Sequence, residues 1–176
     1  SIAICVTLLK ELGASVQYFV PHRFREGYGL HYSVVEMIKT HEIGLLITLD
    51  CGVSNVKEIT QIKEETEAAV LVMDHHTIPE VLPPFDVMLN PHCLPDTHYL
   101  RHLCTAGIIY AFGLYYFTKI NHEFSVESLL DVVAVGTVGD IARLQGANRD
   151  YVKAGLDLLS QKKRHGFRCL LELAEF

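Results

Sequence analysis

Two short apolar runs, each ending in an acidic residue, constrain the fold of this chain more than any other feature. The runs "GLLITLD" (44–50) and "AAVLVMD" (68–74) are continuously apolar, as expected for strands that are buried on both faces. A polar segment with helical spacing, residues 54–66, lies between them. Because a strand, a helix and a second strand follow one another, we predict two parallel strands joined by a right-handed crossover.

The same alternation of strand and helix patterns extends beyond this unit. Ser54 is predicted to be the N-cap of the helix at 54–66. The sequence predicts an α/β fold, with a parallel β-sheet flanked by helices and a mostly helical C-terminal part after about residue 95. The remaining predicted elements are strands at 15–20 and 85–89 and helices at 2–12, 31–40, 101–118, 125–136, 148–161 and 166–174.

Size and composition narrow the class of protein further. The chain has 176 residues, 49% of them hydrophobic, and no internal repeat or linker, so we expect a single domain over 1–176. No apolar run is long enough to span a membrane, and five scattered cysteines without a C-x-x-C pair argue against disulfides and structural zinc and for a reducing cytoplasm. A net charge of -6 argues against a large basic face for nucleic acid.

Polar residues follow both apolar runs at the edge of the sheet where ligands usually bind. Asp50 closes the first run, and the triplet Asp74, His75 and His76 closes the second. In parallel sheets, ligands bind beyond the carboxyl ends of the strands. As alternatives, Asp50 could cap the following helix, and the triplet could form a turn with two surface histidines. Two adjacent imidazoles level with another strand-end acid favour a site.

A further acid and several polar residues lie outside these two runs. Asp140 follows an apolar helical stretch and a pair of glycines, and it could instead cap the next segment. Arg23, in the loop "PHRFREGYG" (21–29), could face a phosphate or form part of a polar connection. Asn148 and Arg149 are candidates for substrate contacts, or for capping and flanking the next helix.

Asp50, His75 and Asp140 together form a mixed oxygen-and-nitrogen ligand set. Such a set suits manganese, iron or zinc better than calcium, and it is typical of two-metal hydrolysis of phosphate esters. His76, next to the ligand His75, could contact a substrate phosphate. Asp74 could hold one of the histidines in a single tautomer.

The motifs around these residues resemble the DHH phosphoesterase superfamily and, within it, the RecJ-type exonucleases specific for single strands. The superfamily is named for the triplet present here at 74–76. The resemblance covers nearly the whole chain, in the order typical of the family. Its segments are "PHRFREGYGL" (21–30), "LLITLDCGVSNVKEI" (45–59), "MLNPH" (88–92), "LCTAG" (103–107) and "LLDVVAVGTVGDIARLQGANRDYVKAGL" (129–156).

This resemblance implies a hydrolase dependent on Mn²⁺ or Mg²⁺ that removes nucleotides from the 5′ end of single-stranded DNA, in the 5′-to-3′ direction, during DNA repair and recombination. It implies metal-ligand roles for Asp50, His75 and Asp140, a substrate-side role for His76 and an orienting role for Asp74. It also makes single-strand-binding or replication and repair proteins candidate partners.

The chain departs from the family pattern at its start. The family's first motif, an Asp-x-Asp-Gly segment, is absent, and Ser1 stands about where that motif ends. We therefore expect a DHH domain truncated at both ends, with an incomplete two-metal site and little activity by itself. Two alternatives stay open: a DHH phosphoesterase that acts on oligoribonucleotides, cyclic dinucleotides or pyrophosphate, and a non-catalytic RecJ-like scaffold of replication.

Overall fold

A computed structural model describes residues 1–22, 24, 27 and 29–174. Its strands are β1 (Leu45–Leu49), β2 (Ala69–Met73) and β3 (Val87–Leu89). Its helices are α1 (Ile2–Glu11), α2 (Tyr32–Thr40), α3 (Val56–Glu65), α4 (Thr105–Lys119), α5 (Leu130–Gly139), α6 (Ala147–Ser160) and α7 (His165–Leu173), with short 3-10 turns η1 (Pro91–Cys93) and η2 (Val126–Leu129).

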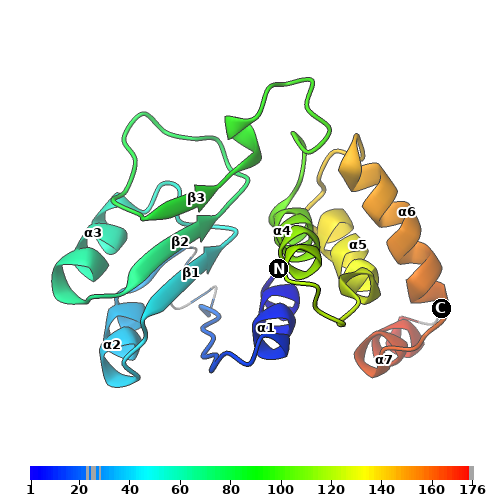
Figure 1. The fold of residues 1–176 in the computed structure, drawn as a ribbon, viewed down its shortest axis with the longest axis horizontal. Coiled ribbons are helices and arrows are strands. Elements are labelled where there is room, and N and C mark those ends of the chain that lie inside the picture. The colour runs from blue at the N-terminus through cyan, green and yellow to red at the C-terminus, as the bar shows by residue number, and fades with distance from the viewer. Residues whose placement is uncertain (23, 25–26, 28, 175–176) are drawn as a thin grey trace.

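The strands form a parallel sheet in the order β1-β2-β3. Leu45 pairs with Ala69 at one end of the first pairing, and Met73 pairs with Leu89 at the far end of the second. This register places the carboxyl ends of all three strands at one edge. The predicted α/β class is confirmed, with helices on both sides of a parallel sheet (Figure 1).

Side chains alternate between the two faces of the sheet, and each face has its own core. Val70 and Val72 pack with buried residues of α2 and α3. Met73, the next residue in β2, packs instead with the core built from α1, α4, η2 and the start of α5. Because successive side chains of β2 point to opposite faces of the sheet, this strand contributes to the cores of both halves of the molecule seen in Figure 1.

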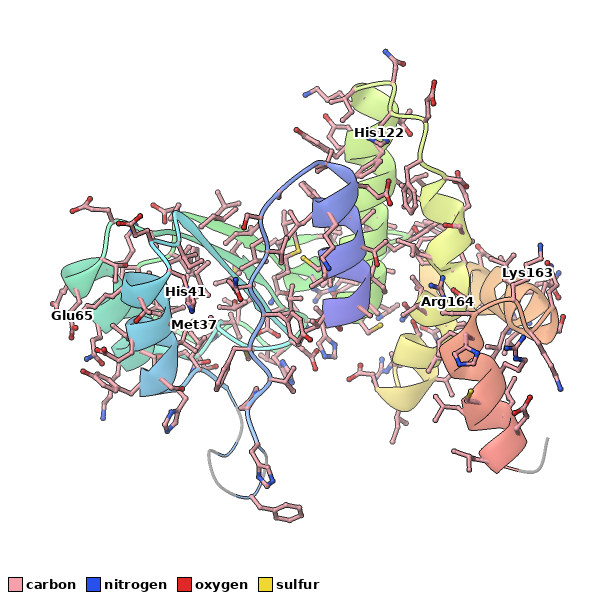
Figure 2. All side chains as sticks on the ribbon, turned by 90° about the horizontal axis from the view of Figure 1, so that it is seen from below. Met37, His41, Glu65, His122, Lys163 and Arg164 are labelled. Carbon is pink, nitrogen blue, oxygen red and sulfur yellow. The ribbon has the colours of Figure 1, made fainter. Side chains whose placement is uncertain are left out.

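The helical half is held together by close backbone contact and by one ion pair. α5 and α6 approach so closely at Gly155 that a Cβ atom there would lie 2.1 Å from the carbonyl oxygen of Leu130. Arg164, which Figure 2 labels just before α7, donates from Nε to Asp131 Oδ2 at 2.8 Å and from Nη2 to Oδ1 at 3.0 Å. This two-pronged contact ties α7 to the first turn of α5.

The predicted strand at 15–20 is wrong. These residues have no strand assignment, and β1 has no strand partner on its outer side among the described residues. A largely apolar cavity of about 530 Å³ lies along β1 instead, lined by this segment and by α2, including Met37 and His41, which Figure 2 labels. An alternating apolar pattern forms a strand only where another strand supplies hydrogen bonds.

Three predicted helix starts also need correction. The helix predicted at 125–136 begins at Leu130, because Val126–Leu129 form the 3-10 turn η2. Asn55, not Ser54, is the N-cap of α3, because residues 50–54 form an irregular turn after β1. The helix predicted at 101–118 begins at Thr105, since residues 95–103 form successive turns closed by backbone hydrogen bonds. Within the described part of the chain, no helix has the length and apolarity needed to cross a membrane.

Candidate metal centre

Asp50 directly follows β1, and the strand fixes the position of its backbone. Its backbone N–H donates to the carbonyl of Met73 at 3.0 Å, so the β1–β2 pairing continues up to the acid. Its φ of 65° then turns the chain sharply out of the sheet. A left-handed conformation is unusual for a residue with a side chain and is found often at functional sites.

His75 and Asp140 meet Asp50 at this edge. His75 Nε2 lies 3.2 Å from Asp50 Oδ1 and 3.6 Å from Asp140 Oδ2. Asp140 comes from the helical half of the molecule, as the C-cap of α5. The structure therefore brings together three predicted metal ligands from β1, from the turn after β2 and from the end of α5.

The Nε2 atom of His75 is a polar atom without a hydrogen bond. It is shielded from solvent, and no described group makes a hydrogen bond to it. Asp50 Oδ1 at 3.2 Å and Asp140 Oδ2 at 3.6 Å lie within ion-pair distance of this nitrogen. A buried imidazole nitrogen that faces two carboxylates without a bond is the arrangement expected of a metal ligand.

Asp74 orients His76 rather than His75. The Asp74 side chain is 1% exposed. Its Oδ1 lies 2.7 Å from His76 Nδ1 and accepts from the His76 backbone N–H at 3.2 Å, while Oδ2 accepts from the N–H of Val53 at 3.1 Å. Because an ionised carboxylate only accepts, Nδ1 carries the proton and Nε2 is the nitrogen with a lone pair. Asp74 thus ties together the turns that follow β1 and β2.

The charges of the cluster perturb one another. The His75 imidazole holds the pKa of Asp50 below its usual range, and Asp50 in turn raises the pKa of His75. Burial raises the pKa of Asp140. Burial also raises the pKa of the Cys51 thiol to about 12, so this neighbour of Asp50 stays protonated and is no nucleophile.

Two residues that support the site were not identified from the sequence. The hydroxyl of Thr105 donates to Asp50 Oδ1 at 2.9 Å. The side chain of Asn90 donates to the carbonyl of His76 at 2.9 Å and accepts from the N–H of His92 at 2.8 Å. The sequence signals for Asn90 are its place at the end of the third strand and within the family segment "MLNPH" (88–92), and Thr105 lies within "LCTAG" (103–107).

Two predicted substrate contacts, Asn148 and Arg149, are not among the side chains that meet at this cluster. Asn148 is fully buried, and its amide donates to the carbonyls of His102 and Arg143, so it joins α6 to two loops. Arg149 is exposed on α6. Arg23 lies outside the described residues, so its predicted role stays untested.

The donor set fits a divalent cation of the manganese or magnesium type. Ligand atoms of Asp50, His75 and His76 all lie within 4.8 Å of one another, and Asp140 adds a second carboxylate next to His75. Carboxylate oxygen with neutral imidazole suits Mn²⁺ well and can serve Mg²⁺. The cavity beside β1 touches this cluster only at Asp50 and Cys51, so the candidate site is the sheet edge and not the cavity.

Comparison with known proteins agrees with the geometry. The model of the DHH family, N-terminal domain, matches residues 1–137, and this chain belongs to that family. The match includes Asp50 and the triplet and ends shortly before Asp140. Among curated relatives, the single-stranded-DNA-specific exonucleases RecJ of Haemophilus influenzae and Thermus thermophilus are each 36% identical over 99% and 97% of this chain.

Solved structures of RecJ exonucleases also have the fold of this chain. A crystal structure of exonuclease RecJ bound to manganese superposes with a TM-score of 0.83 at 34% identity and covers 97% of this chain. RecJ of Thermus thermophilus in complex with Mn²⁺ gives 0.77 at 30% identity. This chain spans 32% and 25% of the lengths of the two curated relatives, and 43% and 24% of the two solved chains.

Proposed function

We propose that this chain carries the metal-binding core of a RecJ-type exonuclease, which hydrolyses phosphodiester bonds from the 5′ end of single-stranded DNA. The observation that carries the proposal is the meeting of Asp50, His75 and Asp140 at the carboxyl edge of the sheet, where a buried imidazole nitrogen faces two carboxylates. The names of the relatives supply the substrate class.

Asp50, His75 and Asp140 would hold Mn²⁺ or Mg²⁺. When bound, such a cation makes a water molecule more acidic and offsets negative charge on the phosphate. The protein's own contribution is to fix the ligands before the substrate arrives. Asp50 is held by the β1–β2 pairing, and Asp140 by the end of α5.

His76 is proposed as the residue on the substrate side of the site. Its side chain is 48% exposed, while Asp74, behind it, is buried. With the proton kept on Nδ1 by Asp74, Nε2 can accept a hydrogen bond or, once protonated, donate one to a phosphate oxygen. Asp74 acts on the substrate only through His76, so it is a positioning residue.

Because we expect little activity from this chain by itself, the test is release of label from 5′-labelled single-stranded DNA under single-turnover conditions, with the protein in large excess and Mn²⁺ present. We expect labelled mononucleotide as the first product, its loss in Asp50→Ala and its retention in Asp157→Ala, an exposed acid on α6. Circular dichroism would establish that both variants are folded. Equal cleavage by a folded Asp50→Ala would remove Asp50 from the site, and a ladder of labelled products would reverse the polarity.

We also propose a cytoplasmic location, a single folding unit over 1–176, and single-strand-binding or replication and repair proteins as partners. The support is the scattered cysteines, the continuous helical half and the net charge of -6, which leaves DNA capture to a partner or to another part of the protein. Cell fractionation, a urea unfolding curve and sedimentation with a single-strand-binding protein test these points. Recovery of the protein in the membrane fraction would refute the cytoplasmic location. Two unfolding transitions would refute the single folding unit, and the absence of a complex would refute the proposed partner.

A further inference from the structure

Thr105 reaches Asp50 across 55 positions of the sequence. It is the first residue of α4, it is 1% exposed, and its Oγ1 donates to Asp50 Oδ1 at 2.9 Å. No pattern in the sequence connects this helix start with the end of β1. The contact is therefore a product of how α4 packs against the sheet edge.

The position of this hydroxyl is fixed by its surroundings. Cys104, Thr105 and Ala106 are all buried, so the first turn of α4 is embedded in the core. A β-branched side chain has few rotamers in a helix. Cys104, the N-cap of α4, makes no side-chain capping bond, and the adjacent hydroxyl is directed at the acid of β1.

The orientation of the Asp50 carboxylate is not set by its own backbone or by burial, so a hydrogen bond from Thr105 can determine it. Its backbone is in the left-handed region, where the Cβ direction differs from that of the preceding strand. Its side chain is 39% exposed, so burial alone does not select one rotamer. The oxygen that accepts from Thr105 is the same Oδ1 that faces His75 Nε2 at 3.2 Å. Both contacts therefore favour one orientation of the carboxylate.

We propose that Thr105 is a positioning residue that holds the Asp50 carboxylate in the orientation needed to share a divalent cation with His75 and Asp140. The metal half of this statement rests on the proposed function, whereas the orienting half does not. Removing a hydrogen-bond partner of a metal ligand typically weakens metal binding about 10- to 100-fold.

The test compares three variants of the full chain. Thr105→Val keeps the β-branched shape and removes the hydroxyl. Thr105→Ser restores the hydroxyl. Thr118→Val is the matched control, because Thr118 lies on the same helix and its hydroxyl donates only to the nearby carbonyl of Leu114. Urea unfolding establishes that each variant is folded.

Two measurements are made on each variant. Three-bond couplings from the Asp50 backbone to Cγ, measured by NMR without metal, report the side-chain rotamer. We expect one rotamer in the parent chain, Thr105→Ser and Thr118→Val, and averaged couplings in Thr105→Val. Calorimetric titration with Mn²⁺ should give a dissociation constant about 10- to 100-fold higher for Thr105→Val and values close to the parent for the other two.

A single Asp50 rotamer in folded Thr105→Val, or averaged couplings in the parent chain, would overturn the orienting role. Unchanged Mn²⁺ affinity in Thr105→Val would overturn the link to metal binding. If the parent chain binds no Mn²⁺, the proposed metal site fails, and the couplings still decide whether Thr105 positions Asp50.

Discussion

Replacing Asp74 by alanine is expected to lower the free energy of unfolding by about 3 kcal/mol, and the size follows from the three contacts it makes. The N–H of Val53 is buried, and leaving a buried donor without an acceptor costs about 1–3 kcal/mol. The backbone N–H of His76 is part-buried and contributes about 0.5–1.5 kcal/mol. The exposed ring of His76 adds about 0–1 kcal/mol. Removing the carboxylate also removes its desolvation cost, which offsets part of the loss.

His76→Ala is the matched control, because it deletes only the ring contact and leaves both backbone donors bonded to Asp74. It is expected to cost about 0–1 kcal/mol. Urea unfolding of both variants in EDTA, followed by far-UV circular dichroism, gives the two free energies. A loss in Asp74→Ala no larger than that in His76→Ala would show that the buried carboxylate does not hold the two turns together.

Two further predictions concern pH and packing. The pKa of His75 is raised, chiefly by Asp50, so its protonated form stabilises the metal-free fold below about pH 6.5, and this stabilisation disappears as the pH rises through the higher folded pKa. The Tm difference between the parent chain and His75→Gln in EDTA should thus be larger at about pH 5.5 than at about pH 8.5, and equal differences would contradict this sign. Gly155→Ala should cost about 1–3 kcal/mol in urea unfolding because its Cβ meets the Leu130 carbonyl, whereas Gly166→Ala, with open space around it, should gain up to about 1 kcal/mol. Similar values for the two alanine variants would refute the close contact of α5 with α6.

The sequence predicted the sheet and all three proposed ligands, and the sheet and two of these ligands depend on local patterns alone. Continuous apolar runs identify buried parallel strands, and parallel strands place their terminal residues at one edge. Asp50 and His75 follow directly from that geometry. Asp140 was proposed as a ligand from its place after an apolar helical stretch and two glycines, and the family resemblance implies the same role. Local pattern does not place the end of that helix near the sheet, so only the fold shows that Asp140 lies next to His75.

The features that sequence reasoning missed depend on contacts between distant segments. Residues 15–20 have the alternation of a strand, but they lie across a cavity from β1 and form no ladder. Thr105 lies in the family segment "LCTAG" (103–107), but its contact with Asp50 is seen only in the folded chain. Asn148 is a polar residue of a type that often contacts substrates, but here it is buried and its amide donates hydrogen bonds to the carbonyls of His102 and Arg143.

The metal site itself is tested most directly by anomalous diffraction at the manganese edge from crystals of the chain equilibrated with saturating Mn²⁺. We predict a peak enclosed by Asp50 Oδ1, His75 Nε2 and Asp140 Oδ2, because His75 Nε2 already lies 3.2 Å from the first oxygen and 3.6 Å from the second. A map with no peak between these side chains, or with manganese bound only elsewhere, would contradict the assignment of this edge as a metal centre.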